Sequence, residues 1–113
     1  MGFHVLLVEP AALSLLARET FRDVNFLMRP AHLAQVAAVV DDPASSPNDR
    51  GVALALLRNA EVAANFVLPL CQDTGTAVVI GKKGQQVWTG YSDEEALSRG
   101  IFNAYTGNSL RYS

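Results

Sequence analysis

The stretch from Cys71 to Thr76 brings a thiol, an amide, a carboxylate and two hydroxyls together, in the order Cys71–Gln72–Asp73–Thr74–Gly75–Thr76. Gly75 permits a turn that other residue types rarely adopt. Loops that crowd such polar groups are often functional. A polar turn before a strand, with a structural cysteine, is the alternative interpretation, because most lone cysteines are inert. Residue types alone leave both interpretations open.

A thiol nucleophile needs a nearby base such as histidine. The histidines of the chain, His4 and His32, are both distant from Cys71 in sequence. We interpret His32 as a solvated residue in the first turn of a helix and His4 as a polar strand position. Arg111 offers a guanidinium that can bind a carboxylate through two hydrogen bonds, although an isolated arginine is more often a surface residue.

Apolar residues at three- and four-residue spacing predict helices around this polar stretch. The first helix begins at Ala11 and must end before Pro30, which starts a second helix that ends near Asp41. Ser46 and Pro47 are typical of the start of a third helix, which would run to about Asn65. The pair Ser92 and Glu95 forms a capping box for a last helix.

The predicted strands are short. Phe3–Val8 is interpreted as a strand or an extended lead-in, and Val67–Leu70 as an extended run that delivers Cys71. Thr76–Lys82 and Gln85–Thr89 flank Lys83–Gly84, which predicts a β-hairpin with a solvated basic tip and a glycine at positive φ. The expected fold class is therefore α+β, with three helices, a β-hairpin after the Cys71 loop and a C-terminal helix. So small a sheet needs partners, and a second chain could complete it.

Composition narrows the class of protein. The chain has 113 residues, of which 50% are hydrophobic and 18% charged, and this excludes an intrinsically disordered chain. A net charge of -2 gives no general attraction to nucleic acid or to anionic membranes. The single cysteine excludes an internal disulfide framework and a multi-cysteine metal site built by one copy. Without a membrane-spanning run or a signal peptide, the expected location is the cytoplasm.

Several blocks of the sequence, in the same order, resemble class I fumarate hydratase, the iron–sulfur type. The main block runs from Leu68 to Ala77 and contains the polar stretch described above. The other blocks are Leu27–His32, Ala53–Asn59, Gly81–Gln85, Val87–Gly90, Asp93–Glu95, Leu97–Gly100 and Leu110–Ser113. The Gly81–Gln85 and Val87–Gly90 blocks resemble the long single-chain form of the enzyme. The resemblance spans nearly the whole chain.

The chain also departs from this family at a few positions. Phe66 stands where the family commonly has a small residue or glycine, and Ser109 where asparagine usually precedes the leucine–arginine pair. Tyr91–Ser92 replaces a glycine pair. Family members are several times longer, so the resemblance implies that residues 1–113 form a single or partial domain, the N-terminal segment of the cluster-binding domain.

The resemblance implies hydration of fumarate to L-malate with a [4Fe–4S] cluster, held by three cysteines, as the Lewis acid. By position, Cys71 is a cluster ligand and Gln72 and Asp73 belong to the substrate pocket. Asp73, the catalytic residue, would bond to the substrate hydroxyl or serve in proton transfer, and Arg111 would bind a substrate carboxylate. Because this chain has one cysteine, we expect the isolated chain to be inactive and to bind no cluster.

Other functions stay open at this stage. The chain could be a non-catalytic truncated module that self-associates or binds a partner, and a related hydro-lyase could act on tartrate or mesaconate. The expected partners are a small dicarboxylate substrate and further copies of the chain, with no nucleic acid and no membrane. A homo-oligomer is expected because Val52–Leu57 is apolar all round and the small sheet lacks neighbours.

Overall fold

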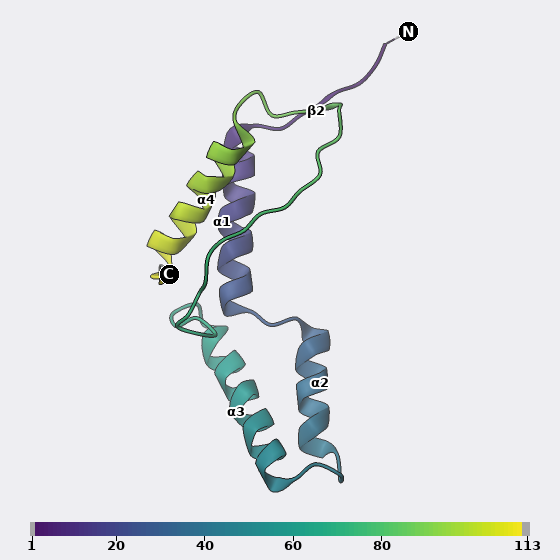
Figure 1. Ribbon diagram of the computed structural model, residues 1–113, viewed down its shortest axis with the longest axis vertical. Coiled ribbons are helices and arrows are strands. Elements are labelled where there is room, and N and C mark those ends of the chain that lie inside the picture. The colour runs from purple at the N-terminus through teal and green to yellow at the C-terminus, as the bar shows by residue number, and fades with distance from the viewer. Residues whose placement is uncertain (1, 112–113) are drawn as a thin grey trace. The chain divides into compact units, whose positions relative to one another are not determined.

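The computed structural model describes residues 2–111 (Figure 1), so Tyr112 and Ser113 of the last block above lie outside the described residues. Its elements, in chain order, are β1 (Leu6–Leu7), α1 (Pro10–Phe26), α2 (Pro30–Asp41), α3 (Pro47–Ala63), β2 (Val87–Trp88) and α4 (Asp93–Gly107). The α+β class is confirmed. The chain divides into two compact units, one of residues 1–22 with 73–113 and one of residues 23–72. Each unit is described by itself.

The helix starts agree with the capping signals of the sequence. Pro30 is the first residue of α2 and Pro47 the first of α3. The hydroxyl of Ser46 accepts a hydrogen bond from the Asp49 N–H at 3.0 Å, and the Asp49 carboxylate accepts one from the Ser46 N–H at 3.0 Å. The hydrogen bond from the Ser46 N–H, followed by one from the Ser46 hydroxyl, lowers the pKa of Asp49. At α4 the hydroxyl of Ser92 accepts from the Glu95 N–H at 3.3 Å.

In the unit of residues 23–72, α2 and α3 lie side by side (Figure 1). The buried residues of α3 are the small Ala53, Ala60 and Ala63. Phe26, at the end of α1, is fully buried, and its ring centroid lies 5.5 Å from that of Phe66 at a tilted angle. An aromatic pair of this kind contributes about 0.5–1.5 kcal/mol beyond its buried area.

In the other unit, the first part of α1 packs closely on α4. The Ser14 hydroxyl donates a hydrogen bond to the main-chain carbonyl of Ala96 at 2.6 Å. A β-carbon built at Gly100 would lie 2.1 Å from the main-chain oxygen of Ser14 and 2.8 Å from the β-carbon of Ala17. Only a residue without a side chain fits there. The helix spacing, and hence the position of every α4 side chain, depends on this contact.

The β-hairpin prediction is wrong. Val87–Trp88 pairs in parallel with Leu6–Leu7, and residues 76–84 form no strand. The Leu6 N–H donates to the Gln86 carbonyl at 2.7 Å, and the Val8 N–H donates to the Trp88 carbonyl at 2.8 Å. The partner of β2 is thus a distant segment of the chain, which local β-propensity cannot identify.

Lys83, at the predicted hairpin tip, forms an ion pair in the structure. The Lys83 ammonium lies 2.6 Å from a carboxylate oxygen of Asp93, the first residue of α4. This hydrogen bond, followed by one from the Thr89 hydroxyl, lowers the pKa of Asp93. Gly84 is not at positive φ, whereas Gly75 and Gly90 are. In the described part of the chain, no helix combines the length and apolarity required to cross a bilayer.

We expect Gly100→Ala to destabilise the 113-residue chain by about 1–3 kcal/mol. The added methyl must displace the main chain of Ser14, because a backbone carbonyl cannot rotate away as a flexible side chain can. Urea denaturation followed by circular dichroism measures the change in the free energy of unfolding.

Gly51→Ala is the matched control, because Gly51 lies in α3 with nothing within 4 Å of the position of its β-carbon. There the same change should stabilise the chain by up to about 1 kcal/mol, through helix propensity. Equal effects of the two substitutions would contradict the close helix contact.

Candidate functional site

Cys71 lies in an irregular segment after α3, and its side chain is exposed. This confirms its predicted loop position. Both main-chain polar groups of the preceding residue, Leu70, form hydrogen bonds. The Leu70 N–H donates to the carbonyl of Asn25 at 2.8 Å, and the Leu70 carbonyl accepts from the side-chain amide of Asn59 at 2.8 Å. The end of α1 and the face of α3 therefore fix the main chain immediately before the thiol.

Residues 73–75, which we call the Asp73 turn, are fixed by different contacts. Gly75 has a φ of +70°, where glycine is strongly favoured. Its N–H donates to Oδ1 of Asp73 at 3.4 Å, so the turn engages one oxygen of this carboxylate. The phenol hydroxyl of Tyr105, on α4, lies 3.4 Å from the Thr74 carbonyl and 3.2 Å from the Gly75 carbonyl.

Arg111 follows a defined helix end. Ser109 adopts a φ of +54°, and the Leu110 N–H donates to the carbonyl of Tyr105 at 3.0 Å. A left-handed residue followed by this long backward hydrogen bond is the Schellman arrangement that ends many helices. Leu110 is buried, and the carbonyl of the exposed Arg111 accepts a hydrogen bond from the Thr74 hydroxyl.

The structure thus brings two of the predicted site residues together. Asp73 and Arg111 belong to the same unit, and the Thr74 side chain connects the Asp73 turn to the Arg111 main chain. Cys71 and Gln72 are exposed and belong to the unit of residues 23–72. The predicted motif Cys71–Asp73 therefore joins the two units of the chain.

The chain supplies one ligand suited to an iron–sulfur cluster. Cys71 is a free, exposed thiol, and thiolates are the usual ligands of such clusters. Residues 2–111 contain no group of three or more histidine, cysteine, aspartate or glutamate side chains arranged to hold a metal ion. The Cys71 thiol is therefore available as one ligand of this kind.

A hollow of about 400 Å³ adjoins the Asp73 turn, and its lining is mostly apolar. It is lined by Gly75, Thr76, Ala77, Ser98, Ile101, Phe102 and Tyr105. This lining includes no cationic side chain that could bind a dicarboxylate.

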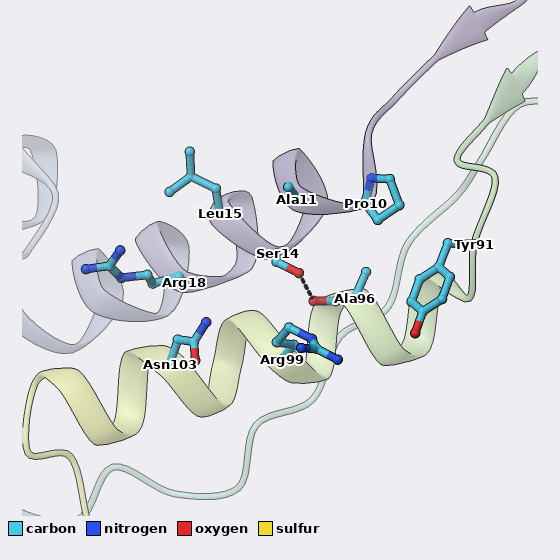
Figure 2. A pocket seen from close by; sticks show the side chains of 9 residues that line it. All are labelled: Pro10, Ala11, Ser14, Leu15, Arg18, Tyr91, Ala96, Arg99 and Asn103. Atoms are coloured by element: carbon cyan, nitrogen blue, oxygen red, sulfur yellow. Dashed lines mark hydrogen bonds between the residues drawn. The ribbon is translucent and has the colours of Figure 1, made fainter.

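A second hollow, of about 540 Å³, lies between the first part of α1 and α4, and Figure 2 shows its lining residues. It contains two arginines but none of the predicted site residues. Arg18 lies 4.0 Å from Glu19, and Arg99 lies 3.7 Å from Glu95. Glu95 also accepts a hydrogen bond from the Tyr91 hydroxyl, which raises the pKa of Tyr91. Both guanidiniums thus already face carboxylates, so this hollow is not the predicted substrate site.

Sequence reasoning missed two residues that hold the site. No motif in the sequence marks Tyr105 as a site residue, and Asn59 stands out only as the end of a resemblance block. Two of the departures from the family pattern coincide with unusual backbone geometry near the site. Phe66 and Ser109 are the two described non-glycine residues with positive φ, at +60° and +54°. Glycine and asparagine tolerate this conformation best.

Comparison with known proteins gives a consistent result. A family profile described as fumarate hydratase (Fumerase) matches residues 14–113. The chain is 59% identical over 112 residues to "Fumarate hydratase class I, anaerobic" and 57% identical over 112 residues to "Fumarate hydratase class I, aerobic", both from Escherichia coli strain K12. It is 52% identical over 112 residues to "Fumarate hydratase 2" from Leishmania major. Each match covers 99% of this chain and 20% of the relative, so the chain spans about a fifth of their length.

We expect Ser109→Gly to stabilise the chain by about 0.5–1 kcal/mol. Glycine removes the steric cost of the left-handed conformation at the end of α4, and this gain exceeds its larger entropy loss on folding. Ser109→Asn should give a smaller gain of the same sign. Urea denaturation of the 113-residue chain measures both.

Ser98→Gly is the matched control, because Ser98 is an exposed serine inside α4. The same substitution there should destabilise the chain by about 0.5 kcal/mol, from helix propensity alone. A loss of stability in Ser109→Gly would contradict the left-handed turn that precedes Arg111.

Proposed function

The chain belongs to the fumarate hydratase (Fumerase) family, and from this premise we propose that it forms part of a class I enzyme that adds water to fumarate to give L-malate. One observation carries the proposal. The Thr74 hydroxyl connects the turn that bears the Asp73 carboxylate to the main chain of Arg111. This contact supports a shared site in which Asp73 transfers a proton and Arg111 binds a carboxylate.

In this proposal, each residue of the motif has a chemical role toward a dicarboxylate. The Arg111 guanidinium binds one substrate carboxylate through two parallel hydrogen bonds. The side-chain amide of Gln72 donates to a substrate oxygen. Asp73 transfers the proton that accompanies addition of the hydroxyl group to the double bond, which is general acid–base catalysis by a carboxylate. The turn engages Oδ1 of Asp73, so its second oxygen can meet the substrate.

Cys71 completes the proposal as one ligand of a [4Fe–4S] cluster. When bound, such a cluster supplies an open iron that acts as a Lewis acid toward substrate oxygens. The exposed position of the thiol supports this role, and so does the hydrogen-bonded main chain before it. A single thiolate does not hold a four-iron cluster, so the remaining ligands must come from polypeptide outside residues 2–111.

A non-catalytic module is the second candidate. The exposed apolar segment Val78–Ile80 favours it, because such a surface suits association with another chain. The substrate alternatives, tartrate and mesaconate, differ from fumarate in groups that the residues described here do not discriminate.

We expect catalysis when this chain replaces the matching segment of the anaerobic E. coli relative. The chimeric enzyme, purified without oxygen, should hydrate fumarate, and Cys71→Ser in it should abolish both cluster absorbance and turnover. A hydroxyl is a far poorer iron–sulfur ligand than a thiolate. Visible absorbance and conversion of fumarate to malate measure the two effects.

Val67→Ser in the same chimera is the control. It introduces the same side chain at an exposed position of the irregular segment and leaves the thiol in place. A folded, cluster-loaded chimera that fails to hydrate fumarate would contradict the proposed function and favour the module. Faster conversion of tartrate or mesaconate would reassign the substrate.

We also propose that the 113-residue chain self-associates when isolated. Val78 and Ile80 are 71% and 94% exposed, and Val52 and Leu56 of α3 are about half exposed. Covering each such side chain contributes about 1.5–3 kcal/mol. Light scattering coupled to size-exclusion chromatography should give at least twice the monomer mass of 12.1 kDa.

Ile80→Lys should lower this mass toward that of the monomer, because a charged residue in an exposed apolar segment opposes pairing with another chain. Thr20→Lys adds the same charge at an exposed polar position of α1, apart from these apolar side chains, and should leave the mass unchanged. A monomer mass for the unmodified chain at high micromolar concentration would contradict self-association.

A further inference from the structure

We propose that Tyr105 is a positioning residue of the hydration site, whose hydroxyl fixes the Asp73 turn relative to Arg111. The inference rests on the proposed function, since it concerns the two residues assigned to proton transfer and to substrate binding. The proposal gives Tyr105 no direct contact with substrate or cofactor. It acts through the main chain of the segments that carry Asp73 and Arg111.

The side chain of Tyr105 forms the first connection. The residue lies on α4 and is only 6% exposed. Its hydroxyl reaches the carbonyls of Thr74 and Gly75, at 3.4 and 3.2 Å. A buried phenol hydroxyl needs a partner, and so do main-chain carbonyls that helices and sheets do not satisfy. This contact meets both needs, and it connects a helix to a segment without regular structure.

The main chain of Tyr105 forms the second connection. Its carbonyl accepts the Leu110 N–H at 3.0 Å, and Leu110 is 4% exposed, so the residue before Arg111 is held in place. The Thr74 hydroxyl then donates to the Arg111 carbonyl. Three hydrogen bonds thus link Tyr105 to Thr74, Thr74 to Arg111, and Leu110 to Tyr105. The peptide bond between Leu110 and Arg111 closes the loop, which we call the hydrogen-bond ring.

A closed ring of this kind reduces the freedom of the turn and of the chain end together. Each residue held in one conformation loses backbone entropy, and folding must offset this loss before substrate arrives. A site that is already ordered does not meet that cost during binding or catalysis. Tyr105→Phe keeps the buried aromatic side chain and removes only its hydroxyl. The substitution therefore opens the hydrogen-bond ring at the contact with the Asp73 turn.

Tyr91 offers a matched control within the same unit. It is 49% exposed, and its hydroxyl bonds to Glu95 rather than to the Asp73 turn. Tyr91→Phe therefore removes the same chemical group from the same type of residue, away from the hydrogen-bond ring. Both variants retain an aromatic side chain.

The direct test measures the motion of the Asp73 turn in the 113-residue chain. Backbone ¹⁵N relaxation should give order parameters near the rigid value of about 0.85 for Thr74 and Gly75 in the unmodified chain and in Tyr91→Phe. In Tyr105→Phe these values should fall below about 0.6, while those of the α4 core stay unchanged. Unchanged order parameters at the turn in Tyr105→Phe would overturn the proposal.

The functional test uses the chimeric enzyme. Tyr105→Phe should lower kcat/KM for fumarate by about 10- to 100-fold with normal cluster absorbance, because small misplacements of reacting groups carry penalties of this order. The loss should divide between kcat and KM, since Asp73 and Arg111 are both displaced. Arg111→Lys, which keeps the charge but loses the two-bond geometry, should act mainly on KM.

A merely structural role predicts a different pattern. It would lower the unfolding midpoint of Tyr105→Phe and leave kcat and KM unchanged well below that midpoint, which would overturn the proposal. Tyr91→Phe should keep the kinetics of the unmodified chimera. An inactive unmodified chimera would contradict the proposed function instead, and the relaxation experiment would still decide whether Tyr105 holds the turn.

Discussion

The segment that carries the candidate site has no helix or strand of its own, so its main-chain polar groups need partners from the rest of the chain. Residues 64–86 connect α3 to β2 in irregular conformation. Buried or half-buried peptide groups without hydrogen bonds are costly, which makes each side chain that reaches this segment important. Asn59 meets this need before Cys71, and Tyr105 meets it after Asp73.

These side chains are useful only because their helices are well placed. Tyr105 follows Ala104, which is fully buried, and lies on the helix that Gly100 brings against Ser14. A helix held this closely gives its side chains little freedom to shift. The small residues of the contact between α1 and α4 therefore control the precision of the site, although none of them carries a reactive group.

Much of the fold could be predicted from local signals, because helix starts depend on neighbouring residues. Pro30, Ser46 and Ser92 act within one turn of the helices that they begin, and these three helix starts were confirmed. Of the capping box predicted at Ser92, the structure shows the half in which the Ser92 hydroxyl accepts a hydrogen bond. The hairpin was wrong for the opposite reason. Val87 and Trp88 have high strand propensity, but their partner lies near the start of the chain. Propensity indicates that a segment is extended and does not indicate what it pairs with.

The same distinction applies to the site. Cys71, Gln72, Asp73 and Arg111 could be proposed from the resemblance to a family, and the structure connects Asp73 to Arg111 through Thr74. The role of Tyr105 could not be proposed, because its hydroxyl bonds to residues about 30 positions away in the chain. An apolar helix face predicts burial of the ring, whereas the partner of the hydroxyl depends on the tertiary fold.

The division of the chain has a consequence for the order of folding. Residues 23–72 form one contiguous unit, whereas the other unit is assembled from both ends of the chain. The bond between Ser14 and Ala96 joins residues 82 positions apart, and the pairing of β1 with β2 is equally non-local. Because distant contacts form more slowly than local ones, the contiguous unit should fold first during synthesis. The connection between the Asp73 turn and Arg111 must wait until the end of α4 has been made.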